Sequence, residues 1–192
     1  MVELTAKTGP RAEAELASPL RMPALDFSAV YEEHAAFVWR CVRRLGVREA
    51  DVADASQEVF LVAHRKLSEF QQGTNLRSWL FAICIRVAAA HRRRAWVRRE
   101  RATDAVAVED ETPANQGDDL DRKRTREKLD GILDRLDDDK RAVFVLFELE
   151  ETSMADVAAA VGCPLQTAYS RLHAARRQVE AAVRRLHEGG WP

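Results

Sequence analysis

The chain has 192 residues, of which 46% are hydrophobic and 32% charged, and a formal net charge of −1. This length is enough for one ordinary domain or two small ones, and the near-neutral charge excludes a protein that is cationic throughout. No apolar run approaches the roughly 18 residues that span a membrane, and the charged N-terminus lacks the apolar core of a secretory signal. Sustained strand-like alternation is absent and helical periodicity is frequent, which predicts an all-α protein.

The three cysteines, Cys41, Cys84 and Cys163, are far apart and odd in number. No C-x-x-C pair or Cys/His cluster accompanies them, so we expect no zinc site and no other metal or cofactor. Each lies in or beside an apolar helical pattern, where a thiol is usually a small buried hydrophobe. Reduced thiols suggest the cytoplasm.

Residues 1–24 are rich in alanine, proline and charge, and we expect them to form a disordered arm. A first helix is predicted over residues 28–45, capped by Asp26 or Ser28 and ended by Gly46. Its apolar side chains are Val30, Phe37, Val38, Cys41, Val42 and Leu45. A second helix is predicted over residues 49–70, with an inward stripe of Val52, Ala55, Val59, Ala63, Leu67 and Phe70.

Another face of the second helix is acidic and carries an apolar side chain at its centre. Asp51, Asp54, Gln57, Glu58, Leu61 and Arg65 recur there at spacings of three and four. By position alone, a solvated surface is the simpler interpretation, because singly exposed leucines are common. The alternative is a docking surface on which the leucine anchors a partner and the carboxylates steer it.

A loop over residues 71–75 precedes a third helix, predicted over residues 76–99, which is strongly basic towards its end. Between Leu76 and Arg101 there are eight arginines against one acid, interleaved with Trp79, Phe81 and Trp96. Cations beside aromatic side chains are typical of surfaces that bind nucleic acid. Leu76, Trp79, Leu80, Ile83, Val87 and Ala90 are expected to pack inward.

The charge then changes sign, since residues 102–121 carry seven acids and no base. The run Thr112-Pro113-Ala114-Asn115-Gln116-Gly117 should break any helix there, so we expect a flexible acidic linker between two small helical domains. The opposed charges also suggest a hypothesis: the linker masks the basic surface.

The second domain ends in a predicted helix-turn-helix. Two helices come first, one around residues 129–136 and one capped within residues 137–139. Ser153 and Asp156 then form a capping box, Gly162 ends the next helix, and Pro164 opens the last. Ala168, Leu172, Ala175 and Val179 share one face of that last helix, which leaves a polar and cationic face free for a major groove. A helical hairpin that serves stability alone is the alternative for this stretch.

Both halves together resemble the extracytoplasmic-function (ECF) sigma factors of bacterial RNA polymerase. The residues 51–60 (DVADASQEVF) with 76–83 (LRSWLFAI) are similar to region two of that family, and residues 166–176 (QTAYSRLHAAR) to region four. The resemblance implies region two over residues 25–96, a linker over 97–122 and region four over 123–188. It also implies an alternative sigma factor that binds core RNA polymerase and directs it to promoters.

The resemblance assigns three sets of residues. The core-polymerase face, which would dock on the β′ clamp helices, is Asp51, Asp54, Gln57, Glu58 and Leu61. The set implied for melting and holding the −10 element is Asn75, Arg77, Arg86, Arg93 and Arg94. The set implied for reading the −35 element is Gln166, Thr167, Tyr169, Ser170, Arg171, His173, Arg176 and Arg177, of which Arg171 and Arg176 are the best-placed cations. Promoter DNA, the β flap and an anti-sigma factor that holds the protein at a membrane are further implied partners.

The chain departs from the family pattern at a few of these positions. Arg86 and Ala90 stand where the family usually has Asn and Asp, and Tyr169 and Ala174 where a Lys and an Arg are frequent. Nothing in the sequence resembles an active site, so we expect a binding protein and not an enzyme. Two other classes stay open: a helix-turn-helix regulator that acts without polymerase, and a protein that binds only other proteins.

Overall fold

The computed structural model describes residues 26–70, 75–102 and 118–188, and within these ranges it contains helices and no strand. The all-α prediction is confirmed. None of the helices in the described ranges has the length and apolar character needed to cross a membrane. The predicted arm over residues 1–24, the loop residues 71–74 and the tail after residue 188 lie outside the described ranges.

The described part of the first half contains three α-helices, of which α1 runs from Phe27 to Arg44. Of its two expected caps, Asp26 is the one that acts, because its side chain accepts a hydrogen bond from the backbone N–H of Ser28. All six side chains of the predicted apolar face are buried. The chain leaves α1 through Gly46, whose φ of +87° a glycine adopts without steric cost.

The second helix is shorter than predicted, because both of its ends tighten into 3₁₀ turns. α2 spans Val52–Lys66, between the turns Glu49–Asp51 and Leu67–Glu69. α3 spans Leu76–Ala102, and Asn75 caps it by accepting from the backbone N–H groups of Arg77 and Ser78.

Between residues 118 and 188 the structure contains four α-helices: α4 (Asp118–Leu133), α5 (Asp138–Phe144), α6 (Met154–Val161) and α7 (Leu165–His187). Ser153 caps α6 as predicted, and Asp137 is the one of the three acids at 137–139 that caps α5. Between α6 and α7, Gly162 takes the left-handed conformation with φ of +72°, and Pro164 directly precedes the last helix. A π-helical turn over Val145–Leu149 links α5 to α6.

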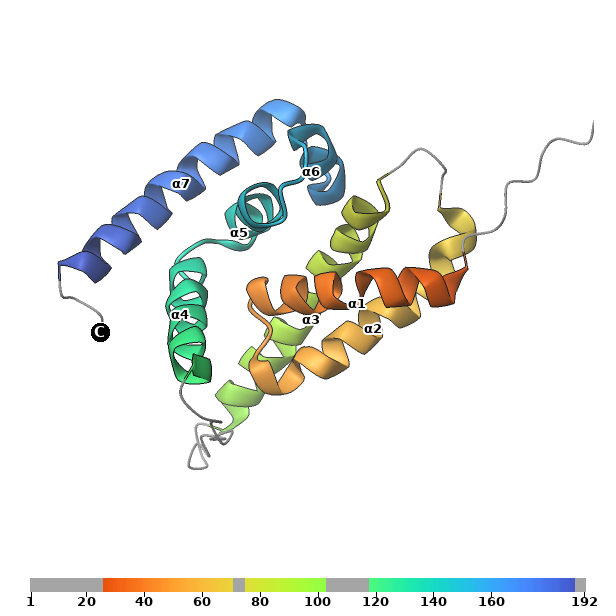
Figure 1. The fold of residues 1–192 in the computed structure, drawn as a ribbon, viewed down its shortest axis with the longest axis horizontal. Coiled ribbons are helices and arrows are strands. Elements are labelled where there is room, and N and C mark those ends of the chain that lie inside the picture. The colour runs from red at the N-terminus through yellow and green to blue at the C-terminus, as the bar shows by residue number, and fades with distance from the viewer. Residues whose placement is uncertain (1–25, 71–74, 103–117, 189–192) are drawn as a thin grey trace, which may run out of the picture.

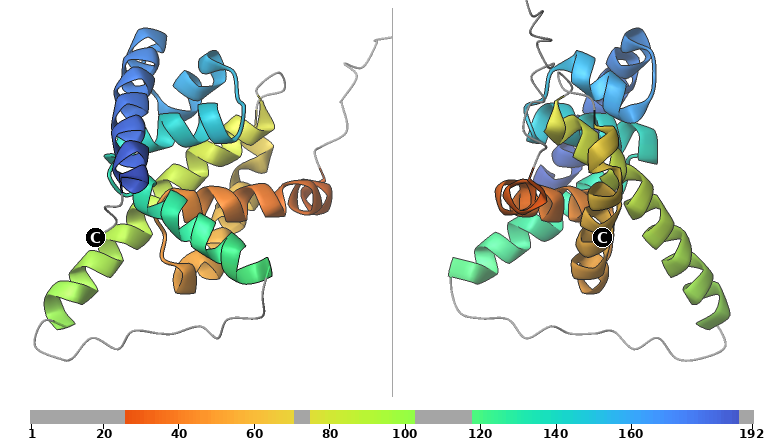
Figure 2. Two further views of the ribbon diagram at one scale, coloured as in Figure 1. Left: turned by 60° about the vertical axis from the view of Figure 1, so that its left-hand side comes forward. Right: turned by 90° about the vertical axis from the view of Figure 1, so that its right-hand side faces the viewer.

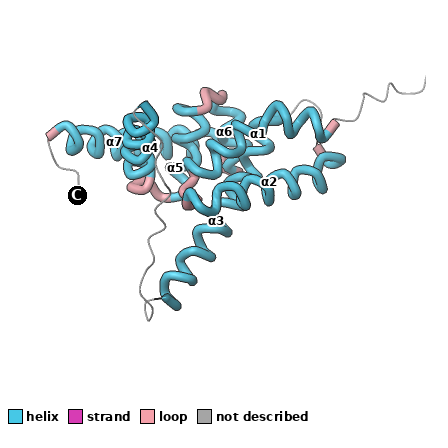
Figure 3. The backbone as a smooth tube through the Cα atoms, turned by 60° about the horizontal axis from the view of Figure 1, so that its bottom comes forward, coloured by secondary structure: helices cyan, strands magenta, loops and turns pink. Residues whose placement is uncertain are grey.

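Helix extends into both ends of the predicted linker. α3 continues to Ala102 and α4 begins at Asp118, whereas the linker was expected over residues 97–122. Figures 2 and 3 show the end of α3 projecting away from the other helices. The remaining residues, 103–117, are outside the described ranges, and so is the hypothesis that their acids mask the basic surface.

The two halves do not stand apart, because α6 packs beside the N-terminal part of α3 (Figure 1). Buried side chains of both halves form one continuous apolar cluster, from Val38 and Cys84 on one side to Met154 and Leu172 on the other. The sequence offers no sign of this contact, because helical periodicity shows which face of a helix is buried but not against which neighbour.

The two left-handed glycines provide a matched test of this junction. Gly162→Ala should destabilise the chain by roughly 1–2 kcal/mol, because its backbone is left-handed and a Cβ there has no atom within 4 Å. Gly46→Ala should cost more, because a Cβ there would lie 2.7 Å from Nη1 of Arg141, a residue of the second half. Urea unfolding of both variants measures the difference, and equal losses would contradict a tight approach at Gly46.

Candidate nucleic-acid interface

One side of α7 is an uninterrupted polar stripe open to solvent. The buried side chains Ala168, Leu172 and Ala175 fix which side of the helix faces inward. The opposite side carries exposed side chains at helical spacing: Gln166, Tyr169, Ser170, His173 and Arg177. We call these five residues the α7 stripe. A helix that presents hydrogen-bonding groups and a cation along one free side is able to enter a major groove.

Three other residues predicted for this interface lie beside the stripe. Arg171 forms an ion pair with Asp139, and Arg176 donates through Nε to Glu148 at 2.6 Å, so acids of the same half hold both. Arg176 also lies over the ring of Phe147, 5.7 Å from its centroid. Thr167 is half-buried. The structure therefore brings five of the eight predicted residues onto one open face and leaves these three at its margins.

The basic segment of α3 divides into paired and unpaired arginines. Arg94 pairs with Glu58 on α2, and Arg98 pairs with Asp51 in the turn that precedes α2. Arg86 and Arg93 are exposed and form no ion pair among the described residues. Of the three interleaved aromatics, Phe81 is fully buried and Trp79 packs against Phe70, so Trp96 alone among the three is exposed. The unpaired cations and Trp96 are the part of α3 that is open to a polyanion.

The other two residues predicted for this surface, Asn75 and Arg77, contact the second half of the chain. The side-chain amide of Asn75 donates to Asp156 at 3.3 Å. Arg77 donates to Glu150 at 2.8 Å and stacks over Phe37, 4.5 Å from the ring centroid. In this arrangement neither side chain is free for another partner.

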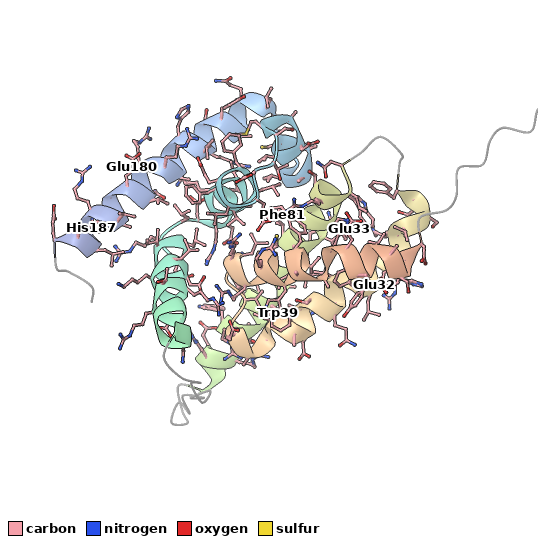
Figure 4. All side chains as sticks on the ribbon, viewed as in Figure 1. Glu32, Glu33, Trp39, Phe81, Glu180 and His187 are labelled. Atoms are coloured by element: carbon pink, nitrogen blue, oxygen red, sulfur yellow. The ribbon has the colours of Figure 1, made fainter. Side chains whose placement is uncertain are left out.

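The acidic face of α2 borders an apolar groove between α1 and α2. Leu61 is 53% exposed and Trp39, labelled in Figure 4, is 43% exposed. Both line the groove, whose volume is about 640 Å³, together with Tyr31 and Gln57. Asp54 is exposed beside it. An exposed tryptophan and leucine on the walls of one groove are typical of a protein-docking surface.

Sequence reasoning missed the α1 side of this groove. Tyr31 and Trp39 lie off the apolar stripe of α1, and the periodicity analysis followed only the buried face. A search for large aromatics outside the stripe would have found them. The residues that join the two halves, Glu150, Arg40, Arg44 and Arg141, were also missed, and no local pattern distinguishes them from ordinary surface charge.

Two acids of the α2 face also stabilise the first half. Asp51 accepts from Arg48 and from Arg98. Glu58 accepts from His91 at 2.9 Å and from Arg94 at 3.3 Å. Desolvation raises the pKa of Glu58, but the hydrogen bonds from His91 and Arg94 outweigh it and lower that pKa below its ordinary value. Asp51 and Glu58 therefore link α2 to neighbouring segments, whereas Asp54 points freely to solvent.

Neither the acids nor the thiols of the described residues suggest reaction chemistry. No group of three or more His, Cys, Asp or Glu side chains there could hold a metal ion. Burial raises the pKa of the Cys41 and Cys84 thiols, so both stay protonated, uncharged and poorly nucleophilic at neutral pH.

Two family models match the chain. The model described as Sigma-70 region 2 matches residues 30–98, and the one described as Sigma-70, region 4 matches residues 126–179. The first covers most of α1, all of α2 and most of α3, and the second covers the C-terminal half of α4 and reaches into α7.

Curated relatives of the chain are named as RNA polymerase sigma factors. The chain is 32% identical over 162 residues to the ECF RNA polymerase sigma factor SigE of Mycolicibacterium smegmatis, with 82% of this chain and 61% of that protein covered. It is 30% identical over 149 residues to the ECF RNA polymerase sigma-E factor of Escherichia coli, with 73% and 78% covered.

Solved structures agree in fold. The sigma factor RpoE of Bartonella quintana, crystallised with the anti-sigma factor NepR, matches with a TM-score of 0.64 and 25% identity over 83% of this chain and 97% of that one. CnrH in complex with the cytosolic domain of CnrY matches with a TM-score of 0.63 and 22% identity, over 82% and 86%.

Asp54 and Glu58 provide a matched pair on the α2 face. Glu58→Gln should lower the free energy of unfolding at pH 7 by about 0.5–1 kcal/mol, because it removes the charge that Arg94 and His91 bind. Asp54→Asn should change it little. Because the folded-state pKa of Glu58 is lowered, its contribution is present above the unfolded pKa and disappears as pH falls through the folded value. Urea unfolding from pH 7 to pH 3 measures both effects, and a pH-independent difference would contradict the assignment.

Proposed function

This chain belongs to the ECF group of the sigma-70 family, and on that premise we propose how its two halves share the work of an alternative sigma factor. The protein binds core RNA polymerase, directs it to specific promoters and separates the strands there. Sigma factors are regulators of transcription and not enzymes, so the work is done by binding energy alone. Region two corresponds to residues 25–96 and region four to residues 123–188.

The observation that carries this proposal is that both region models match one chain in the order two, then four. A helix-turn-helix regulator that acts alone needs the second match and has no use for the first. The acidic face and apolar groove of α2 are likewise unnecessary for a protein that binds only DNA.

Core polymerase binds along α2, with Asp54, Gln57 and Leu61 as direct contacts. The exposed leucine enters the partner's surface, and the free carboxylate of Asp54 attracts its cations. Trp39 adds apolar contact area from α1. Asp51 and Glu58 act mainly by holding α2 against its neighbours, because their carboxylates are already bonded to arginines of this chain.

Promoter DNA binds to both halves. The α7 stripe reads the −35 element from the major groove, with Arg177 on phosphate or guanine and Arg171 and Arg176 adding charge from the sides. Arg86 and Arg93 on α3 bind the backbone of the separated −10 strand, and Trp96 offers an aromatic surface for an unstacked base. Arg94, Asn75 and Arg77 complete the −10 set once their present partners are displaced.

Two further partners belong to this proposal. The solved structure of RpoE contains an anti-sigma factor, and we propose that such an inhibitor also binds this chain and holds it near a membrane. Region four contacts the β flap of the polymerase. The compartment in which the protein acts is the cytoplasm, where polymerase and chromosome are.

Charge reversal tests the polymerase face. Asp54→Lys should reduce co-elution with core RNA polymerase in size exclusion by at least tenfold, because it places a cation where the partner's cations bind. Glu127→Lys, on an exposed position of α4, makes the same change in net charge and should bind normally. Equal binding by both variants, with unchanged circular dichroism, would favour a regulator that acts on DNA alone.

Arg177 tests the α7 stripe. Arg177→Gln should weaken binding of polymerase holoenzyme to promoters selected by the wild-type protein, and it should reduce the slope of log K against log salt by about 1, as expected for one lost phosphate contact. Arg135→Gln, an exposed position in the turn before α5, is the control of equal charge. Run-off transcription and filter binding provide the readouts, and an unchanged slope would remove Arg177 from the DNA contacts.

A further inference from the structure

We infer that Arg40, Arg44 and Arg77 form a binding site for the phosphates of the separated promoter strand, and that Glu150 of region four occupies this site while the two regions are docked. The inference rests on the proposed function, since it adds two residues of α1 to the −10 surface. We call the three residues the arginine triad. Glu150 then acts as an internal competitor of the DNA.

The triad surrounds a single carboxylate. Oε2 of Glu150 accepts from Nη2 of Arg77 at 2.8 Å and from Nη2 of Arg40 at 3.3 Å, and Oε1 accepts from Nη1 of Arg44 at 2.5 Å. The Glu150 side chain is 2% exposed, whereas those of Arg40 and Arg77 are 47% and 42% exposed. Solvent and ions therefore reach Arg40 and Arg77 from outside, whereas Arg44 is only 19% exposed and the carboxylate is buried.

Glu150 does not satisfy the triad. Three guanidinium groups face one carboxylate, which leaves a surplus of two positive charges. Nε of Arg77 is also buried without a hydrogen-bond partner among the described residues. A guanidinium binds a phosphate in the bidentate manner through two parallel N–H groups, so a phosphate would use the donor that Glu150 leaves unpaired. The site is better matched to a polyanion than to its present occupant.

Glu150 is rigidly attached to region four. Its backbone N–H donates to the carbonyl of Val145 at the π-helical turn, and its own carbonyl accepts from the hydroxyl of Thr152. The next residue, Glu151, has a φ of +52°. The carboxylate is therefore withdrawn from the triad only when region four moves as a body.

Three other contacts between the halves follow the same pattern, with a basic or amide side chain of region two meeting an acid of region four. Asn75 meets Asp156, Arg92 pairs with Asp138, and Arg43 pairs with Asp130. The α7 stripe remains exposed in the same arrangement. Docking thus occupies Asn75 and Arg77 of the predicted −10 set, whereas Arg86 and Arg93 of that set and the α7 stripe stay open.

The distance between promoter elements requires the regions to separate. Positions −35 and −10 lie about 25 base pairs apart, or roughly 85 Å of B-DNA at about 3.4 Å per base pair. A compact chain of this length has a radius of gyration of about 16 Å. Both elements are reached together only when region four leaves region two, and that step exposes the triad to the strand.

The test uses the full-length chain and a 15-nucleotide single-stranded DNA of mixed sequence, with binding followed by fluorescence anisotropy. Glu150→Gln should bind the strand at least fivefold more tightly than wild type, because the competitor has lost its charge. Glu151→Gln changes the net charge equally at the exposed neighbouring position and should stay within twofold. The salt slope of Glu150→Gln should be steeper by about 2, as three added contacts at about 0.7 each predict for single strands.

A second substitution identifies the arginines that gain the strand. In the Glu150→Gln background, Arg40→Gln should weaken strand binding at least threefold. Equal strand affinity of Glu150→Gln and Glu151→Gln would overturn the inference, and so would a gain that Arg40→Gln leaves intact.

A cross-link covers the case in which Glu150→Gln fails to fold. Asn75→Cys and Asp156→Cys, combined with Cys163→Ser, place two thiols where the halves meet. A short bis-maleimide should hold the regions together and reduce strand affinity at least threefold relative to the same protein capped with N-ethylmaleimide. Equal affinities would overturn the inference. Binding of core polymerase by Glu150→Gln is measured separately, so loss of the proposed function is distinguished from loss of the triad.

Discussion

The arrangement of the two regions depends on one buried carboxylate. Glu150 lies at the end of a π-helical turn and is bonded to guanidinium groups from α1 and α3. A buried charge is tolerated only when opposite charges and hydrogen bonds compensate its desolvation, so region four is held where the three arginines converge. Arg141 reinforces the junction from the other direction, because its Nε donates to the backbone carbonyl of Arg44 while Asp134 binds its Nη1.

This junction distinguishes two groups of cations. Those near the start of α3 and the end of α1 are bound to acids of region four, whereas Arg86, Arg93 and Arg177 are exposed and form no ion pair among the described residues. A net charge of −1 conceals this division, since a polyanion responds to the local surface and not to the sum. DNA binding by such a chain therefore depends on its conformation as well as on its charge.

The polymerase-facing surface is constructed differently, from apolar side chains beside a free acid. Leu61 and Trp39 line one groove and Asp54 stands exposed near it. Glu58, on the same helix, is bonded to His91 and Arg94 and so contributes to the fold of region two. Residues that share one helical face thus have separate roles, and their present hydrogen-bond partners distinguish those roles.

The sequence by itself determined that the fold is helical, the cap at Ser153, the turn at Gly162 and the resemblance that led to the family. These features depend on residues three or four positions apart, and periodicity records such relations directly. The sequence could not identify the partners of Glu150, which lie 73, 106 and 110 positions away. It also could not show that Tyr31 and Trp39 of α1 line the groove beside α2. It also could not show that Arg77 is engaged while Arg93 is free, because equal side chains on one helix differ only in what packs beside them. The tertiary structure decided these points, since the energy of a buried charge depends on the neighbours that folding brings to it and not on its position in the chain.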